Sequence, residues 1–309
     1  MKAAAVVGSL LRPPASTEAI MFRVVVALVP CIATATVVFG ALTLAHCALA
    51  LGAGAVVEGC ARAVRGLPVR VFADGAAPVT CLLIALAVPP SAPLWITPVA
   101  VLVGLGLARE AYGGLGRNVF NPAMAGYAAV LVAWPHALTW VDGQTGATAL
   151  DALRFRGADT VDEAFRAATF GVVGGRGFEW VNAAALVGGL YLVATRVVHW
   201  RIPLAVLLGM GLPALALHDG GSSESLGSPL FHWFSGATML GAFFIATDPV
   251  TAPRGAAHQW LFGIGIGAVT FLIRADGGYP DGLAFAVLLG NLAAPALDAL
   301  ERRGTVDEG

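Results

Sequence analysis

Charge is scarce in this sequence. Aspartate, glutamate, lysine and arginine make up only 12% of its 309 residues, whereas hydrophobic residues make up 58%, and the mean hydropathy is +0.80. A soluble domain that faces water on its outside cannot have this composition. The net charge of −1 leaves no basic surface for nucleic acid. The sequence therefore predicts an integral membrane protein and excludes nucleic acid as a partner.

Clustered metal ligands are also missing. The four cysteines, Cys31, Cys47, Cys60 and Cys81, stand singly within or beside apolar segments, and the six histidines have no ligand spacing. No glycine-rich fingerprint for a nicotinamide dinucleotide is present. We therefore expect buried cysteines, and in this chain alone neither a metal site, nor a nicotinamide site, nor a catalytic side chain.

Long apolar segments are what the sequence has in abundance. A bilayer core about 30 Å thick requires roughly 20 apolar residues per helix. The first segment has no small-residue cleavage site after it, so we expect a retained span. An all-α polytopic membrane protein with ten spans is predicted, at residues 20–43, 45–63, 75–88, 94–110, 119–135, 179–198, 202–217, 235–247, 257–273 and 282–300.

These spans form two groups of five. The first transmembrane half covers residues 20–135 and the second covers residues 179–300, with a polar loop at 136–178 between them. Residues 1–19 and 301–309 are terminal segments, expected in the cytoplasm. Within the polar loop, the sequence from Thr160 to Glu163 predicts a capping box that begins a short helix.

An internal repeat relates the two halves. Val79 to Pro93 aligns with Met239 to Pro253 at a constant offset of 160, so that Pro89 falls on Pro249. The two copies start five spans apart and must cross the membrane in opposite senses. This predicts two inverted five-helix repeats with short broken helices and a site near the midplane. Chance similarity between apolar segments is the alternative.

Positive charge predicts the orientation. With the N-terminus inside, thirteen of the eighteen lysines and arginines fall on the cytoplasmic side and five on the other. Both termini are then cytoplasmic, and the 136–178 loop faces the periplasm. The seven tryptophans lie near the predicted span ends, as in an aromatic belt.

The polar loop contains the segment Asp142-Gly143-Gln144-Thr145-Gly146-Ala147-Thr148. It matches the pattern Asp-x-x-(Ser/Thr)-Gly-Ala-Thr and so resembles the attachment motif read by periplasmic flavin transferases. The resemblance implies FMN joined through its phosphate to Thr148 as a phosphoester. An ordinary hydrophilic turn is the alternative reading.

A second Gly-Ala-Thr site ends at Thr238. It has His232 where the motif requires aspartate, and an apolar segment follows at once. A flavin phosphate cannot lie unpaired in hydrocarbon. We therefore prefer Thr148, in a hydrated loop, and expect Thr238 to begin a helix near a cofactor.

Three carboxylates lie in or beside predicted spans. Glu58, Asp248 and Asp281 are costly there unless paired or functional, so each is a candidate for an ion pathway. Simpler roles remain open, because Arg62 follows Glu58 at i+4 and could pair with it, and Asp248 could form only the turn before a proline.

Four further motifs carry a resemblance that covers nearly the whole chain. They are Gly116-Arg117-Asn118-Val119-Phe120-Asn121-Pro122-Ala123, Ser235-Gly236-Ala237-Thr238, Ala246-Thr247-Asp248-Pro249 and Gly277-Gly278-Tyr279-Pro280-Asp281-Gly282. In this order they resemble the D subunit of the Rnf electron-transport complex, with Val119 where proline is expected.

The resemblance implies a membrane redox subunit of an ion-translocating ferredoxin:NAD+ oxidoreductase in the bacterial inner membrane. Its expected cofactors are the covalent FMN and a second, noncovalent flavin such as riboflavin, with Asn121 and Thr238 as flavin neighbours. Electrons would be exchanged with ferredoxin and NAD only through the other subunits of the complex. Membrane lipid and a periplasmic flavin transferase are the further expected partners. Two alternatives stay open: the related B subunit of the sodium-pumping NADH:quinone oxidoreductase, whose N-terminal extension this sequence lacks, and an inverted-repeat solute channel or transporter.

Single cysteines introduced at Gln144 and at Arg201, in a background without the four native cysteines, test the orientation. We expect an impermeant maleimide to label position 144 in intact cells, and position 201 only after lysis, because the loop faces the periplasm. Labelling at position 201 in intact cells would contradict this topology.

Overall fold

Helices account for the regular structure of the chain. The computed structural model describes residues 16–138, 148–157, 159–279 and 281–307. Within these ranges every regular element is a helix, and the β-type pairing is an isolated bridge between Phe170 and Gly175. The expected all-α class is therefore confirmed for the described residues.

The first half begins with two long helices and continues with shorter ones. Ser16 caps the first by accepting a hydrogen bond from the backbone N–H of Ala19. Asn121 caps the last, and Pro122 occupies its first turn. The helices are α2 (Thr17–Phe39), α3 (Leu42–Val64), α4 (Ala76–Ala87), α5 (Ile96–Val101), its π-helical continuation η1 (Leu102–Leu107), η2 (Glu110–Tyr112) and α6 (Pro122–Ala133).

Short helices connect this half to the second. They are η3 (Pro135–Leu138), α7 (Ala149–Arg154) and α8 (Val161–Ala164). The predicted capping box at Thr160 and Glu163 is confirmed at α8. The second half contains α9 (Phe178–Ala194), α10 (Arg201–Ala216), η4 (Asp219–Gly221), α11 (Pro229–Trp233), α12 (Thr238–Leu240), the π-helical η5 (Gly241–Ile245), α13 (Ala256–Asp276) and α14 (Leu283–Asp307).

Each predicted span contains helix. Among the described residues, α2, α3 and α13 are long and apolar enough to cross a membrane, and α4, α6, α9, α10 and residues 283–299 of α14 are shorter apolar helices. The two predicted broken spans are short: α4 has 12 residues, and its counterpart is one turn of α12 joined to η5. The chain is a multi-pass membrane protein.

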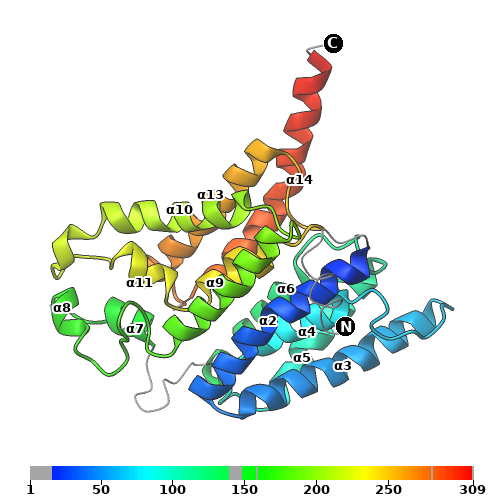
Figure 1. The fold of residues 1–309 in the computed structure, drawn as a ribbon, viewed down its shortest axis with the longest axis horizontal. Coiled ribbons are helices and arrows are strands. Elements are labelled where there is room, and N and C mark those ends of the chain that lie inside the picture. The colour runs from blue at the N-terminus through cyan, green and yellow to red at the C-terminus, as the bar shows by residue number, and fades with distance from the viewer. Residues whose placement is uncertain (1–15, 139–147, 158, 280, 308–309) are drawn as a thin grey trace, which may run out of the picture.

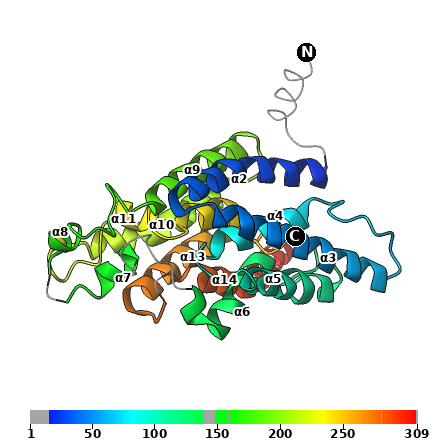
Figure 2. The ribbon, with the colours of Figure 1, turned by 90° about the horizontal axis from the view of Figure 1, so that it is seen from below.

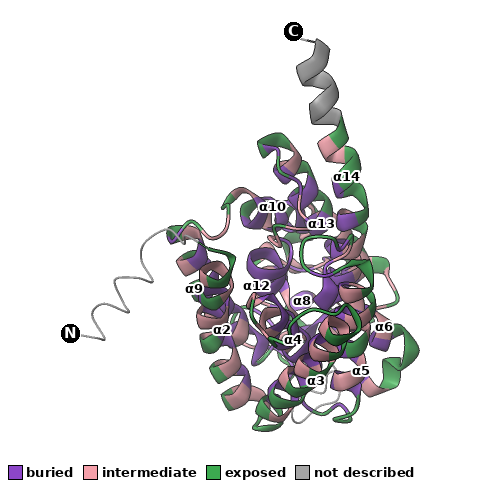
Figure 3. Ribbon diagram, turned by 90° about the vertical axis from the view of Figure 1, so that its right-hand side faces the viewer, coloured by how far each residue is buried: buried purple, intermediate pink, exposed green. Residues whose placement is uncertain are grey.

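The helices pack in pairs around a buried centre. α2 runs beside α9, and α10 lies along α13 (Figures 1 and 2). Burial is greatest around α4 and α12, whereas the outer helices expose much of their length (Figure 3). On α3 the exposed side chains include Leu44, Leu49 and Val56, as expected for a surface in contact with lipid.

Loops gather at two ends of the bundle. At one end, the α3–α4 connection meets the segment after η1, where Arg65 pairs with Glu110 and Arg109 pairs with Asp74 at 2.7 Å. At the other end, which contains Thr148 and which we call the motif end, Arg154 donates to the carbonyl of Asp276 at 3.1 Å. We call the end that contains the Arg65–Glu110 and Arg109–Asp74 pairs the far end. This grouping agrees with helices that run back and forth between two faces.

Tryptophans mark both ends. Trp95 and Trp134 stack edge to face with centroids 5.1 Å apart, one before α5 and the other after α6. Trp200 and Trp260 make a similar contact at 5.9 Å beside the first turns of α10 and α13. These positions support the predicted span boundaries.

In this part of the chain one alternative that had stayed open is excluded, and one expectation was wrong. Glu58 does not use Arg62: its carboxylate accepts the backbone N–H of Phe72 at 2.8 Å, and Arg62 donates to the carbonyl of Pro68. The i+4 spacing places both on one helix face, but the returning α3–α4 connection supplies nearer partners. Cys60 is exposed, whereas the other three cysteines are buried as expected.

Small residues allow α10 and α13 to approach closely. A Cβ at Gly267 would lie 2.1 Å from the carbonyl oxygen of Val206, and one at Gly209 would lie 2.2 Å from that of Ile264. Side chains at these positions would force the backbones apart. The contact therefore depends on glycine, as in other close membrane-helix pairs.

We expect Gly267→Ala to destabilise the protein by about 1–3 kcal/mol, because the added methyl group overlaps backbone. Gly265→Ala is the matched control, since nothing lies within 4 Å of that position on the same helix. The thermal midpoint in detergent should fall for the first variant only. Equal midpoints for the two variants would show that the helices tolerate separation.

Candidate cofactor cavity

A large cavity lies at the motif end. Its volume is about 330 Å³, within the range of small-molecule sites. Most of its wall is apolar and comes from α2, α4, α6, α9 and the start of α14. The polar side chains that line it are Thr43, Tyr127, His136, Thr148, Asp151, Asn182, Ser235, Tyr279 and Asp281.

Thr148 stands at the wall of this cavity. It is the N-cap of α7: its hydroxyl donates to the Asp151 carboxylate at 2.9 Å and accepts the backbone N–H of that residue at 3.2 Å. The expectation that Thr148 lies in a hydrated loop was wrong, because it is only 7% exposed. The remaining motif residues, Asp142, Thr145, Gly146 and Ala147, lie outside the described residues.

An apolar cluster explains why Thr148 is buried. Ala149, Leu150 and Leu153 of α7 pack with Val161 of α8 and with Phe231 of α11. Burying these side chains on one face of two short helices holds the start of α7 against the bundle. The hydroxyl of Thr148 is thereby fixed at the cavity.

The turn before α12 forms another part of the wall. Ser235, Gly236 and Ala237 line the cavity, whereas Thr238 is fully buried behind them. Gly236 has φ +58°, a left-handed conformation that favours glycine. Thr238 begins α12 as expected, and its hydroxyl donates to the carbonyls of His232 (2.7 Å) and Ser235 (3.0 Å).

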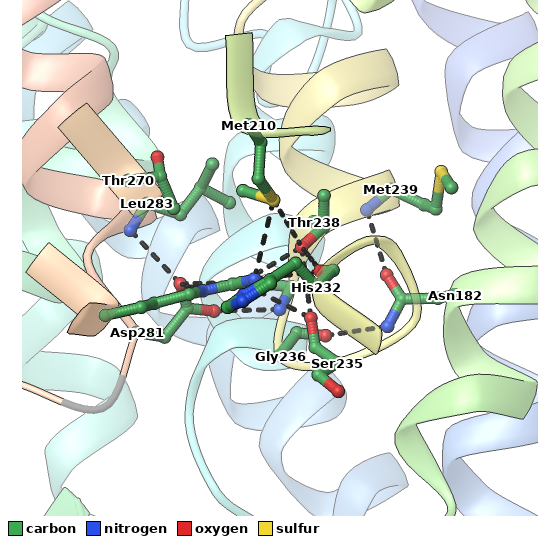
Figure 4. Close-up of polar contacts among 12 residues, drawn as sticks. Asn182, Met210, His232, Ser235, Gly236, Thr238, Met239, Thr270, Asp281 and Leu283 are labelled. Atoms are coloured by element: carbon green, nitrogen blue, oxygen red, sulfur yellow. Dashed lines mark hydrogen bonds and ion pairs between the residues drawn. The ribbon is translucent and has the colours of Figure 1, made fainter. Parts of the chain in front are cut away.

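Asn182 ties this turn to α9 (Figure 4). Its amide nitrogen donates to the carbonyl of Gly236 at 2.8 Å, and its amide oxygen accepts the N–H of Met239 at 2.9 Å. Asn182 is 1% exposed. The backbone groups released where the span breaks are thus satisfied by a side chain, in a place where water is scarce.

A loop before α9 completes the wall. The N–H of Gly175 donates to the hydroxyl of Ser235 at 2.9 Å. Glu179, which is buried, accepts the N–H groups of Val172 and Val173. Sequence reasoning did not single out Glu179 or Asn182, although a polar residue inside an apolar span is a signal that could have found both.

A second, smaller cavity of about 140 Å³ lies toward the far end. It is lined by Asn121, Asp248 and Arg109 among others, and by the starts of α4 and α6. The Asn121 side chain caps α6 and donates weakly, at 3.4 Å, to the Asp248 carboxylate. Arg109 is 3% exposed, and its Nε and Nη1 have no hydrogen-bond partner among the described residues.

The structure separates the predicted site residues into groups. Thr148 and Asp281 line the large cavity, with Thr238 directly behind its wall, whereas Asn121 and Asp248 line the small one. Glu58 lines neither cavity and holds the α3–α4 connection. Asp248 also forms the expected turn, since it accepts the N–H of Val250 at 3.1 Å.

Comparison with known proteins identifies the family of the chain. The family model described as NQR2, RnfD, RnfE matches residues 7–307. The chain belongs to this family. Within it, the chain is 46% identical to the D subunit of the ion-translocating oxidoreductase complex of Pseudomonas paraeruginosa, over 96% of this chain and 93% of that protein.

Other members of the NQR2, RnfD, RnfE family with the same name are similarly related. The Alcanivorax borkumensis protein is 40% identical over 92% of this chain and 90% of its own length. The Vibrio cholerae protein is 37% identical over 93% and 94%. The resemblance inferred from the motifs is thus confirmed at the level of the family and of these relatives.

Proposed function

We propose that this chain is the membrane redox subunit of an Rnf-type ion-translocating ferredoxin:NAD+ oxidoreductase, with FMN esterified to Thr148. Its relatives are named as the D subunits of ion-translocating oxidoreductase complexes. The segment from Asp142 to Thr148 has the attachment pattern. Neither of these facts shows where the flavin ring would lie in the fold.

The observation that carries the proposal is that Thr148 lines the large cavity. The residues present fit a flavin: a mostly apolar wall suits the ring system, and a few polar groups converge to orient it. The bound flavin would supply the electron-transfer chemistry, while the protein supplies position, dryness and charge. Ester formation would replace the proton of the Thr148 hydroxyl, so that Thr148 would no longer donate to Asp151, and the carboxylate would keep only the backbone N–H of Thr148, at 3.4 Å.

The chain's own residues would hold the cofactor in two ways. The apolar ends of α2, α4 and α6 exclude water. Asn182 fixes the turn at Ser235 to Ala237 against α9. Electrons would arrive from ferredoxin and leave to NAD+ through partner subunits, since this sequence has no nicotinamide fingerprint and no cysteine cluster.

The proposal includes ten spans in two inverted repeats. Each half has a left-handed glycine immediately before or near its broken helix, Gly75 before α4 and Gly236 before α12. Each also has a buried arginine near the end of its fourth span, Arg109 and Arg274. The large cavity adjoins the end of α4 and the start of α12, whereas the small cavity adjoins the start of α4 and the end of η5. This exchange of roles is what inverted halves would produce.

We propose that both termini lie in the cytoplasm. The far end then faces the cytoplasm, and the motif end faces the periplasm, where a flavin transferase would act on Thr148. The basic side chains at the far end, including Arg62, Arg65 and Arg117, support that direction. The host membrane would be the bacterial inner membrane.

A second, noncovalent flavin is proposed for the small cavity. The Asn121 amide and the Nη1 group of Arg109, which has no hydrogen-bond partner among the described residues, could meet the polar edge of a flavin ring. The cavity is smaller than typical cofactor sites, so only part of a flavin would lie within it.

Thr148→Ala tests the covalent cofactor. We expect the flavin fluorescence of the denatured chain to disappear, together with its contribution to the intact mass, while the protein remains inserted. Thr160→Ala is the matched control, because Thr160 caps α8 through the same type of capping box. It should cost about 0.5–2 kcal/mol of stability and leave the flavin in place. Thr238→Ala should also retain it.

A signal that survives in Thr148→Ala and vanishes in Thr238→Ala would reverse the assignment. A wild-type chain without an acid-stable yellow chromophore would favour a solute channel or transporter, which broken inverted helices also suit. Covalent flavin with electron transfer to a quinone instead of NAD+ would favour a relative of the quinone oxidoreductase B subunit.

Asp248→Asn tests the ion pathway, for which Glu58 and Asp281 are the other candidates. The asparagine keeps the shape and can still accept the N–H of Val250, but it removes the charge. We expect an assembled, flavinylated complex whose electron transfer to NAD+ is slow and no longer responds to an imposed ion gradient, since coupling requires a differential affinity for the cation.

The measurement uses proteoliposomes with a ferredoxin donor. Asp298→Asn is the control, because Asp298 also accepts a backbone N–H, from Arg254, but does not line the small cavity. A normal rate and gradient response in Asp248→Asn would leave that residue as a turn former.

A further inference from the structure

Arg274, near the end of α13, is a buried charge in an apolar helix. It is 4% exposed, yet all three guanidinium nitrogens have partners. Nη1 donates to the carbonyl of His232 at 2.8 Å, and Nη2 donates to the hydroxyl of Thr238 at 2.9 Å. A weaker contact reaches the carbonyl of Ser235 at 3.3 Å. The guanidinium thus binds the end of α11, at His232, and the Ser235 to Thr238 turn at two places.

Asp281 neutralises this charge and binds the same turn. Its Oδ1 pairs with Arg274 at 3.0 Å and accepts the N–H of Leu283, which opens α14. Its Oδ2 accepts the N–H of Ala237 at 2.9 Å. Figure 4 shows Asp281 beside Gly236, with Thr238 and His232 close by. The ion pair therefore joins α13, α14 and the turn into one unit.

The geometry leaves little freedom in this unit. A Cβ added at Gly236 would lie 2.3 Å from Oδ2 of Asp281 and 2.8 Å from Nη2 of Arg274. The ion pair thus packs directly against the backbone of Gly236. Gly236 and Asp281 both line the large cavity. Movement of the pair would be transmitted to the cavity wall.

The contacts depend on the shape of arginine as well as on its charge. The acceptors lie in different directions, and a planar fork with five N–H groups can reach them together. A lysine ammonium at the same position is a point charge and cannot reproduce this set. Replacing Arg274 by lysine would keep the positive charge and lose most of these hydrogen bonds. This substitution therefore distinguishes a positioning role from a purely electrostatic one.

We propose that Arg274, together with Asp281, is a positioning residue that fixes the Ser235 to Thr238 turn as a flavin-facing part of the cavity wall that also contains Thr148. This inference rests on the proposed function. It also gives Asp281 a role that needs no ion transport, because its carboxylate is committed to an arginine and to two backbone N–H groups.

The first test uses the assembled complex with Arg274→Lys and Arg274→Met. We expect the flavin to remain attached, because the attachment motif is a separate segment, but its visible circular dichroism should weaken in both variants as the wall loosens. The reduction midpoint should shift to more negative potential in Arg274→Met, since a nearby positive charge favours the added electron. Arg176→Lys is the control, being exposed with a single long hydrogen bond to a carbonyl.

The second test does not depend on flavin. In a Thr148→Ala background without the native cysteines, Ser235→Cys reports on the wall through its rate of reaction with a small methanethiosulfonate reagent. Ser235 is 1% exposed, so the starting rate should be low. Arg274→Lys should raise it by about tenfold or more, because hydrogen bonds to a charged group are lost and the turn opens locally.

Native circular dichroism together with an unchanged labelling rate in Arg274→Lys would overturn the proposal, and so would equal changes in Arg176→Lys. If the Arg274 variants fail to assemble, Asp281→Asn replaces them and should show the same faster labelling. A wild-type chain without covalent flavin would refute the proposed function while the labelling experiment still decides whether Arg274 holds the turn.

Discussion

Backbone groups that a broken helix releases must find partners inside the protein, because hydrocarbon offers none. This constraint governs the two halves of the molecule. Asn121 accepts the N–H groups of Ala123 and Met124 where α6 begins. Asn182 and Asp281 accept those of Met239 and Ala237 where α12 begins. The short helices can exist only because such side chains replace water.

The same side chains create the cavities. A continuous helix presents its side chains outward and hides its backbone, whereas a broken one brings polar backbone and small residues to a surface. Gly236 and Ala237 line the large cavity because Arg274 and Asp281 hold the chain in this turn. The side chains that stabilise the interruption of the helix before α12 therefore also place polar groups in the cavity wall.

The sequence predicted the features that depend on local composition. Apolar length located the helices, Pro89 and Pro249 marked the ends of the broken spans, and the spacing of Thr160 and Glu163 located a helix start. These signals are local because a span or a cap is defined by residues close in the chain. The all-helical class followed from them, whereas the family was indicated by longer motifs such as Gly116 to Ala123.

Features that depend on distant segments were missed. The i+4 spacing suggested that Glu58 pairs with Arg62, but the carboxylate binds the backbone of Phe72, brought back by the α3–α4 connection. Thr148 was expected in water, and Phe231, far along the chain, helps to bury it. Arg274 was counted only for orientation, since its partners at His232 and Thr238 are brought near it by the fold.

The burial of Thr148 has a consequence for biogenesis. With 7% of the residue exposed and the hydroxyl bonded to Asp151, a modifying enzyme could not reach the acceptor oxygen in the finished fold. The proposed attachment would therefore have to precede the docking of α7, or catch α7 while it is undocked. Flavin attachment by an extracytoplasmic enzyme would then compete kinetically with the packing of the apolar cluster around α7. Chains in which α7 packs first would carry no covalent flavin.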